Sequence, residues 1–184
     1  MNKILLAGTA LAMAMAAGSA SAANSLNAGT MGLNIGFTSA TAISGSGSPA
    51  DFLISGKYLI AKDTALLAGF GFQSVDTGAA ANATSTDIGF MVGMRKYMKT
   101  DDFAPFIGGR LQYLSTRQGA NDVTDFALIG EAGAEYFFGK QFSLEGSVGF
   151  GYGSAEAKPV GGGTSVKGTG FGTKVFNLGA NFYF

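Results

Sequence analysis

The last nine residues of the chain, Phe176 to Phe184, carry an apolar side chain at every second position. Successive side chains of an extended segment point to opposite faces, so a period of two predicts a β-strand. Three of the last four residues are aromatic, and such a strand must bury its apolar row somewhere. That row consists of Phe176, Leu178, Ala180, Phe182 and Phe184.

This segment resembles the C-terminal strand of bacterial outer-membrane β-barrels. In those proteins a terminal Phe and alternating apolar residues are read by the barrel-assembly machinery. The resemblance implies that the apolar row from Phe176 to Phe184 is an assembly signal, and that this machinery is a partner during insertion. It also implies a location in the outer membrane of a Gram-negative bacterium.

The first residues predict export. One lysine, Lys3, precedes an apolar run from Ile4 to Ala17, and Ala20-Ser21-Ala22 has the small-residue pattern of a cleavage site. A run this short, with no basic stop signal after it, favours a cleaved secretory signal peptide over a membrane anchor. We therefore expect a signal peptide at residues 1–22 and one β-barrel domain at residues 23–184.

Composition excludes several kinds of chemistry. The sequence contains no Cys and no His, so disulfides, thiolate metal sites and every catalytic arrangement that uses histidine are ruled out. The formal net charge is zero, which argues against nucleic acid as a partner. Only 13% of residues are charged, against about a quarter in soluble domains. After the signal, no apolar run approaches the ~20 residues of a membrane helix, so a spanning chain would have to be a closed barrel.

Alternation along the rest of the chain predicts about eight strands. Outer-membrane strands alternate lipid-facing apolar residues with small or polar residues that face the lumen. The segments with this pattern are residues 26–37, 52–61, 64–74, 86–97, 103–116, 124–138, 142–154 and 176–184. Short turns are expected near Lys62, Met98 and Gly139, and longer loops at residues 44–51, 76–85, 117–123 and 155–167.

This alternation of short and long connections predicts an all-β, antiparallel, up-and-down transmembrane barrel with short periplasmic turns and longer external loops. The alternative is a soluble β-sandwich or lipocalin-like barrel, which shows the same alternation. The many Phe and Tyr residues and the low charge favour the membrane barrel.

Charged residues of these strands fall on the face opposite the apolar row, which would be the lumen. Unpaired charge is costly in a low-dielectric interior, so we expect a paired, hydrogen-bonded network that plugs the barrel. A gated ion path through the same groups is the alternative. The predicted network comprises Lys57, Asp87, Arg95, Arg110, Glu131, Glu135 and Glu145.

Nothing in the sequence marks an enzyme, a metal site or a cofactor. The remaining expectation is a structural or surface-interaction barrel, similar to the OmpX, Ail and opacity-protein group. The alternative is a small channel, either a narrow ion pore or a transporter of small hydrophobic compounds similar to the OmpW group. Outer-membrane lipid and lipopolysaccharide are the expected surroundings, and the protein is expected to be a monomer.

Overall fold

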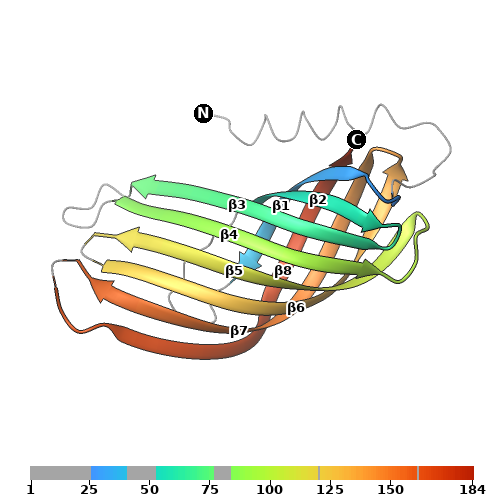
Figure 1. The fold of residues 1–184 in the computed structure, drawn as a ribbon. Coiled ribbons are helices and arrows are strands. Elements are labelled where there is room, and N and C mark those ends of the chain that lie inside the picture. The colour runs from blue at the N-terminus through green and yellow to red at the C-terminus, as the bar shows by residue number, and fades with distance from the viewer. Residues whose placement is uncertain (1–25, 41–52, 77–83, 120, 161) are drawn as a thin grey trace.

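The described part of the chain forms a closed barrel of eight antiparallel strands in the computed structural model (Figure 1). The structure describes residues 26–40, 53–76, 84–119, 121–160 and 162–184. Each strand pairs with its neighbours in the sequence, and β1 also pairs with β8, which closes the barrel. The strands are β1 (Met31–Ala40), β2 (Leu53–Ala61), β3 (Thr64–Asp76), β4 (Thr84–Tyr97), β5 (Phe103–Gln118), β6 (Asn121–Gly139), β7 (Phe142–Pro159) and β8 (Val166–Tyr183).

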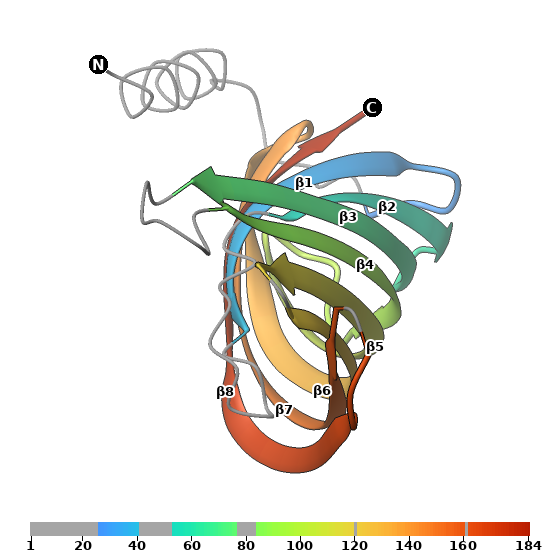
Figure 2. The same cartoon turned by 90° about the vertical axis from the view of Figure 1, so that its left-hand side faces the viewer.

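The two ends of the barrel differ in their connections. Residues 62–63, 98–102 and 140–141 join strands at one end, here called the turn end. The closing strands also meet there, because Met31 and Phe184 exchange backbone hydrogen bonds of 3.2 and 3.0 Å. The other end, here called the loop end, faces the viewer in Figure 2. Strands β3 to β8 extend further toward it than β1 and β2 do.

The predicted fold class is therefore confirmed: an all-β, up-and-down antiparallel barrel. The described residues contain no helix that is both long and apolar enough to cross a membrane. The predicted signal peptide at residues 1–22 lies outside the described residues, as do Phe52 and the predicted loop at residues 44–51.

Several predicted boundaries were wrong, and toward the loop end the strands are longer than predicted. Residues 117–123 were expected to form a loop, yet β5 runs to Gln118, which pairs with Asn121 at the start of β6. The predicted loop at residues 155–167 shrinks to residues 160–165, because β7 continues to Pro159 and β8 starts at Val166. At the loop end most residues are small or polar on both faces of the sheet, so they pair as strands without showing regular apolar alternation.

Burial follows the predicted alternation closely. Along β4, inward residues such as Asp87, Met91 and Arg95 are buried, whereas outward Phe90 and Val92 are 52% and 55% exposed. Large apolar side chains thus cover the outside, while charged and small ones fill the inside. This is the reverse of a soluble barrel, and it fits a surrounding phase of lipid.

Candidate functional site

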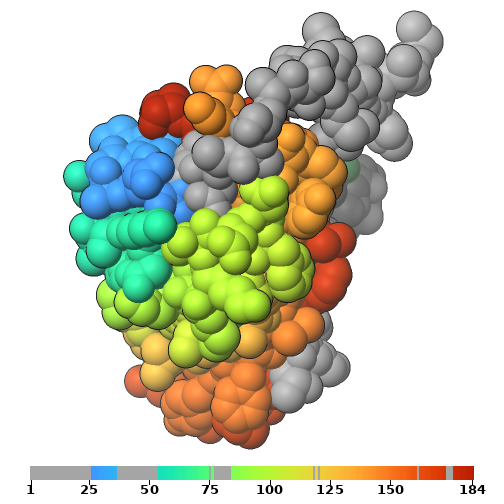
Figure 3. Space-filling model, turned by 90° about the vertical axis from the view of Figure 1, so that its right-hand side faces the viewer, coloured from blue at the N-terminus to red at the C-terminus, as the bar shows by residue number. Residues whose placement is uncertain are grey.

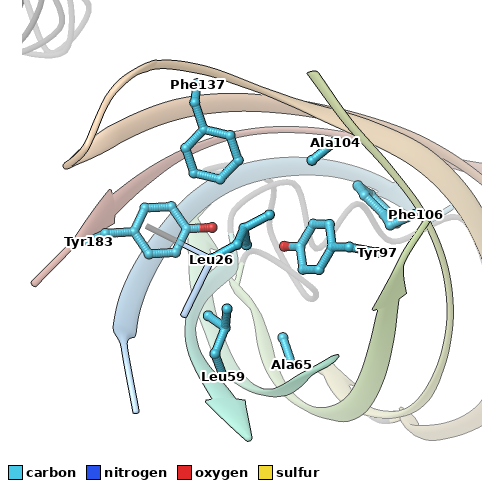
Figure 4. Close-up of a cluster of buried hydrophobic side chains, with 8 residues drawn as sticks. All are labelled: Leu26, Leu59, Ala65, Tyr97, Ala104, Phe106, Phe137 and Tyr183. Atoms are coloured by element: carbon cyan, nitrogen blue, oxygen red, sulfur yellow. The ribbon is translucent and has the colours of Figure 1, made fainter. Parts of the chain in front are cut away.

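An apolar layer fills the barrel interior at the turn end (Figure 4). Its members are Leu26, Leu59, Ala65, Tyr97, Ala104, Phe106, Phe137 and Tyr183, all of which are at most 3% exposed. Leu26 was predicted to lie in the first strand, but it precedes β1 and is fully buried among these side chains. The turn end is seen from outside in Figure 3, where the β4–β5 connection, in green, spreads across the middle of the face.

Two glycines make room for the large rings of this layer. A Cβ atom on Gly133 would lie 2.7 Å from the Phe106 ring and 2.2 Å from the backbone oxygen of Gly146. A Cβ atom on Gly32 would lie 2.9 Å from the Tyr183 ring. Any larger residue would push a ring out of the layer, so these glycines are required by close packing.

The Glu135 carboxylate lies at the junction between this layer and the charges behind it. It is 0% exposed and accepts hydrogen bonds from Tyr97 Oη at 2.7 Å and Tyr183 Oη at 2.5 Å. Asn181 donates to it at 3.0 Å, and the Ser143 hydroxyl also donates to it. Lys57 Nζ completes the set at 2.9 Å. Both carboxylate oxygens are thus satisfied, as a buried carboxylate requires.

A second carboxylate, Glu145, pairs with two of the three basic residues of the network. Lys57 Nζ lies 3.1 Å from Glu145 Oε2, and Arg95 Nη1 lies 2.7 Å from the same oxygen. The Arg95 guanidinium also stacks on the Phe106 ring, 3.6 Å from its centroid, so it contacts the apolar layer as well. Asn177 and Asn181 donate further hydrogen bonds to Glu145 at 3.3 and 3.1 Å.

The network weakens toward Arg110. Glu131 receives Arg95 Nη2 at 3.0 Å, whereas Arg110 Nη1 lies 3.5 Å from the other oxygen of Glu131. Arg110 is 4% exposed, and its Nε and Nη2 atoms have no hydrogen-bond partner among the described residues. The guanidinium of Arg110 is therefore held less firmly than that of Arg95.

The six paired side chains form a neutral group. Lys57, Arg95 and Arg110 balance the three carboxylates, and all six are at most 6% exposed. The group lies inside the barrel, between the strands.

One predicted member lies elsewhere. Asp87 is buried, but it precedes Arg95 by eight residues on β4, or roughly 26 Å along the strand. Conversely, the sequence interpretation left out Tyr97, Ser143, Asn177, Asn181 and Tyr183, which supply much of the hydrogen bonding. The signal was available, because Asn177, Asn181 and Tyr183 alternate with the apolar row of the last strand and so face inward.

The predicted assembly row lies on the outside of β8. Phe176 and Leu178 are 47% and 50% exposed, and Phe184 is 75% exposed. Phe182 belongs to a row of aromatic rings at the turn end, in which Tyr136, Phe138, Phe142 and Phe182 follow one another at centroid distances of 4.9, 5.8 and 5.2 Å. Aromatic girdles of this kind mark the membrane interface of outer-membrane barrels.

Comparison with known families agrees with this geometry. The sequence matches the family described as outer membrane protein beta-barrel domain over residues 7–184, and the chain belongs to that family. Its place is accordingly the outer membrane of a Gram-negative bacterium. A comparison with curated proteins found no significant match.

Solved structures with the same fold are distant in sequence. AlkL, an outer membrane protein, is 14% identical with a TM-score of 0.60, covering 90% of this chain and 94% of AlkL. OprG from Pseudomonas aeruginosa is 13% identical with a TM-score of 0.52, covering 86% of this chain and 97% of OprG. The N-terminal barrel of Pseudomonas aeruginosa OprF is 14% identical with a TM-score of 0.51, covering 85% and 98% of the two chains. At these identities the likeness is one of fold.

Proposed function

We propose that this protein is a structural or surface-interacting barrel whose lumen is closed by the neutral charged group and the apolar layer beneath it. The observation that supports the proposal is that a buried charged group and a buried apolar layer lie one behind the other inside the barrel. Glu135, Glu145, Lys57 and Arg95 hydrogen-bond to one another, and rings from four strands lie behind them at the turn end. A hydrated ion would have to break several buried hydrogen bonds to pass, and each unmade bond is costly.

Conductance of the purified protein in planar lipid bilayers tests this proposal. We expect no discrete current steps from the wild-type barrel. The matched positive control replaces Tyr97, Phe106 and Glu135 together by Ala, which removes part of both the charged group and the apolar layer and should give measurable steps. Wild-type steps as large as those of this variant would contradict a closed lumen.

A narrow, gated ion pore is the second candidate, and the loose attachment of Arg110 favours it. Its 3.5 Å contact with Glu131 is the longest in the buried network, so this is where the ion path would open first. Rare wild-type steps that become more frequent in Arg110→Ala, which removes the loosely held side chain, would support the pore. Transport of small hydrophobic compounds has less support, because the lumen beside the apolar layer is lined by charge.

We further propose that the protein has no catalytic activity, and that it functions as a monomer in contact with outer-membrane lipid and lipopolysaccharide. The barrel closes through β1 and β8 of one chain, so no second copy is needed to satisfy an edge. The apolar outward rows meet the lipid directly.

The row from Phe176 to Phe184 is proposed as the signal for the barrel-assembly machinery. An alternating strand can add to the edge of another sheet, with alternate side chains giving specificity. Deleting Phe184 removes a ring that is 75% exposed and the two backbone hydrogen bonds with Met31, so the refolded barrel should lose only modest stability, whereas outer-membrane accumulation in cells should fall strongly. Heat-modifiable mobility of refolded protein and membrane fractionation of cells measure the two effects. Normal accumulation without Phe184 would contradict the proposal.

A further inference from the structure

The outward glycines of β5 and β6 have a different setting from the inward ones. A Cβ atom on inward Gly93 or Gly108 would lie 2.8 Å from backbone oxygen, so packing requires glycine at both positions. On outward Gly109 and Gly130, a Cβ atom would approach nothing closer than 3.8 and 3.9 Å. Larger side chains would fit there, so barrel packing does not explain why both are glycine.

These outward positions create a groove in the apolar surface. Gly109 pairs with Gly130, and Ala132 follows on the same face of β6. The groove is lined by Gly108, Gly130, Glu131, Ala132, Val148, Gly149 and Phe150, and has a volume of about 490 Å³. The Phe150 ring is fixed as one wall by an edge-to-face contact with Phe171 at 4.4 Å.

The chemistry of the groove is that of hydrocarbon. Its side chains on the outer surface are Ala132, Val148 and Phe150, while the Glu131 carboxylate points inward to Arg95 and Arg110. The groove is continuous with the lipid-facing rows, in which neighbouring Leu128 is 55% exposed. Its occupant must therefore be apolar and must come from the membrane phase.

Position and width favour one kind of lipid. β5 and β7 lie on either side of β6, each one strand spacing of about 4.8 Å away. Ile107 of β5 and Val148 of β7 both pair with Ala132, and the space between their side chains is roughly as wide as one hydrocarbon chain. Toward the turn end the next outward pair is Ala134 and Gly146, both small, and beyond it lies aromatic Tyr136 of the interfacial row. No bulky outward side chain of β6 therefore separates the groove from the interface at the turn end.

We propose that this groove holds one straight acyl chain of a glycerophospholipid from the leaflet at the turn end. The head group of this lipid lies near Tyr136, and its chain runs across Ala134, Ala132 and Gly130 toward the middle of the membrane. The groove thus retains a particular lipid while the rest of the outer face exchanges lipids freely.

Fluorescence quenching can test this, because the sequence contains no Trp. Phe150→Trp places a reporter in the groove, and Phe90→Trp, at an outward β4 position of similar exposure, is the control. Each variant is placed in nanodiscs that mix straight-chain phosphatidylcholine, brominated only at the terminal carbon of an acyl chain, with branched phytanoyl phosphatidylcholine. For each reporter the measured quantity is the fraction of brominated lipid that gives half-maximal quenching. We expect this fraction to be about fourfold lower for Phe150→Trp than for Phe90→Trp, because burying roughly one additional methylene gives a preference of that size. Equal fractions for the two reporters would overturn the proposal.

Filling variants assign the preference to the groove. In the Phe150→Trp background, Gly130→Leu and, separately, Ala132→Leu should abolish the preference, whereas Ala68→Leu on the outside of β3 should keep it. Heat-modifiable mobility shows whether each variant is folded. If only one of the two filling variants folds, that variant is sufficient for the test. A preference that survives filling would overturn the proposal. Loss of quenching at a higher protein-to-lipid ratio would indicate a second copy of the chain instead, and displacement by added lipopolysaccharide would show that the phospholipid source is wrong.

Discussion

Ion pairs of nearly equal length occur in two regions of this barrel. Inside the lumen, Lys57–Glu135 and Arg95–Glu145 measure 2.9 and 2.7 Å, with side chains at most 3% exposed. Outside it, Lys96–Asp63 and Arg117–Asp122 measure 2.6 and 2.7 Å, with side chains 37% to 70% exposed. The N–O distances of the lumen pairs and the surface pairs are therefore alike, whereas their exposure to the surroundings differs.

The difference lies in what happens when one partner is lost. Water can solvate the remaining charge of an exposed pair, so exposed pairs contribute little to stability. In the lumen no water replaces the partner, and an unpaired buried charge is strongly destabilising. The buried pairs therefore need not stabilise the barrel over an apolar filling, but removing one partner of a closely bonded buried pair is costly.

Glu135 should give the largest effect. Glu135→Ala removes the acceptor for Lys57, Tyr97, Ser143, Asn181 and Tyr183 at once. We expect a loss of about 3–5 kcal/mol in the free energy of unfolding, the range for breaking a buried pair. Urea unfolding of the refolded barrel in lipid vesicles measures it. A loss no greater than that of the exposed control Lys158→Ala would contradict a buried, fully bonded carboxylate.

The two lumen arginines should differ from one another. Arg95→Met leaves Glu145 without its 2.7 Å partner and removes the stacking on Phe106, so a loss of about 3–5 kcal/mol is expected. Arg110→Met removes a guanidinium with two unpartnered nitrogens and leaves Glu131 paired with Arg95, so a loss of about 1 kcal/mol or less is expected. The same urea titrations compare them, and equal losses would mean that Arg110 is bonded as firmly as Arg95.

The sequence could not distinguish these two arginines. Alternation assigns Arg95 and Arg110 to the same inward face, because each strand position has one of two faces. Which carboxylate each one meets depends on the stagger between strands, which the hydrophobic pattern does not record. For the same reason Asp87 was grouped with the network, although it lies on the same face of β4 at a different height in the barrel.

The full lengths of the strands also could not be predicted from the apolar alternation. Period-two apolar alternation arises where only one face of a strand meets an apolar phase, so in this barrel it marks the part of each strand that faces lipid. Residues 155–159 and 166–175 carry glycine, small and charged side chains, and they were not assigned to strands although they belong to β7 and β8. By contrast, the alternation predicted about eight strands, the connection lengths predicted their up-and-down order, and the many Phe and Tyr residues with the low charge predicted that the apolar faces point outward.

A charge introduced on the outside of the barrel should destabilise it more, the deeper in the membrane the substituted residue lies. Val92 is outward, near the middle of β4 and 55% exposed. Val92→Arg places a guanidinium in hydrocarbon, so we expect a loss of about 2–4 kcal/mol. Ser154→Arg, outward on β7 near the loop end, should cost about 0–1 kcal/mol. Equal costs in vesicle unfolding titrations would place both positions at the same depth and contradict the spanning direction of the strands.

The exposed pair at the turn between β2 and β3 should give the smallest effect. Lys96 Nζ donates to Asp63 Oδ2 at 2.6 Å, and this hydrogen bond holds the pKa of the Asp63 carboxyl below its ordinary value. A carboxyl with a lowered pKa in the folded state stabilises the barrel above its unfolded pKa, near 3.9 for Asp, and loses that contribution as the pH falls through the lower folded value. Lys96→Ala should therefore shift the urea midpoint slightly at neutral pH, and the shift should vanish once the pH is well below the ordinary range of an Asp carboxyl. Added salt should also reduce it, because exposed charges are screened. A shift that stayed constant across this pH range, or that matched the loss for Glu135→Ala, would mean that the turn pair is as enclosed as the lumen pairs and would remove the contrast between the two regions.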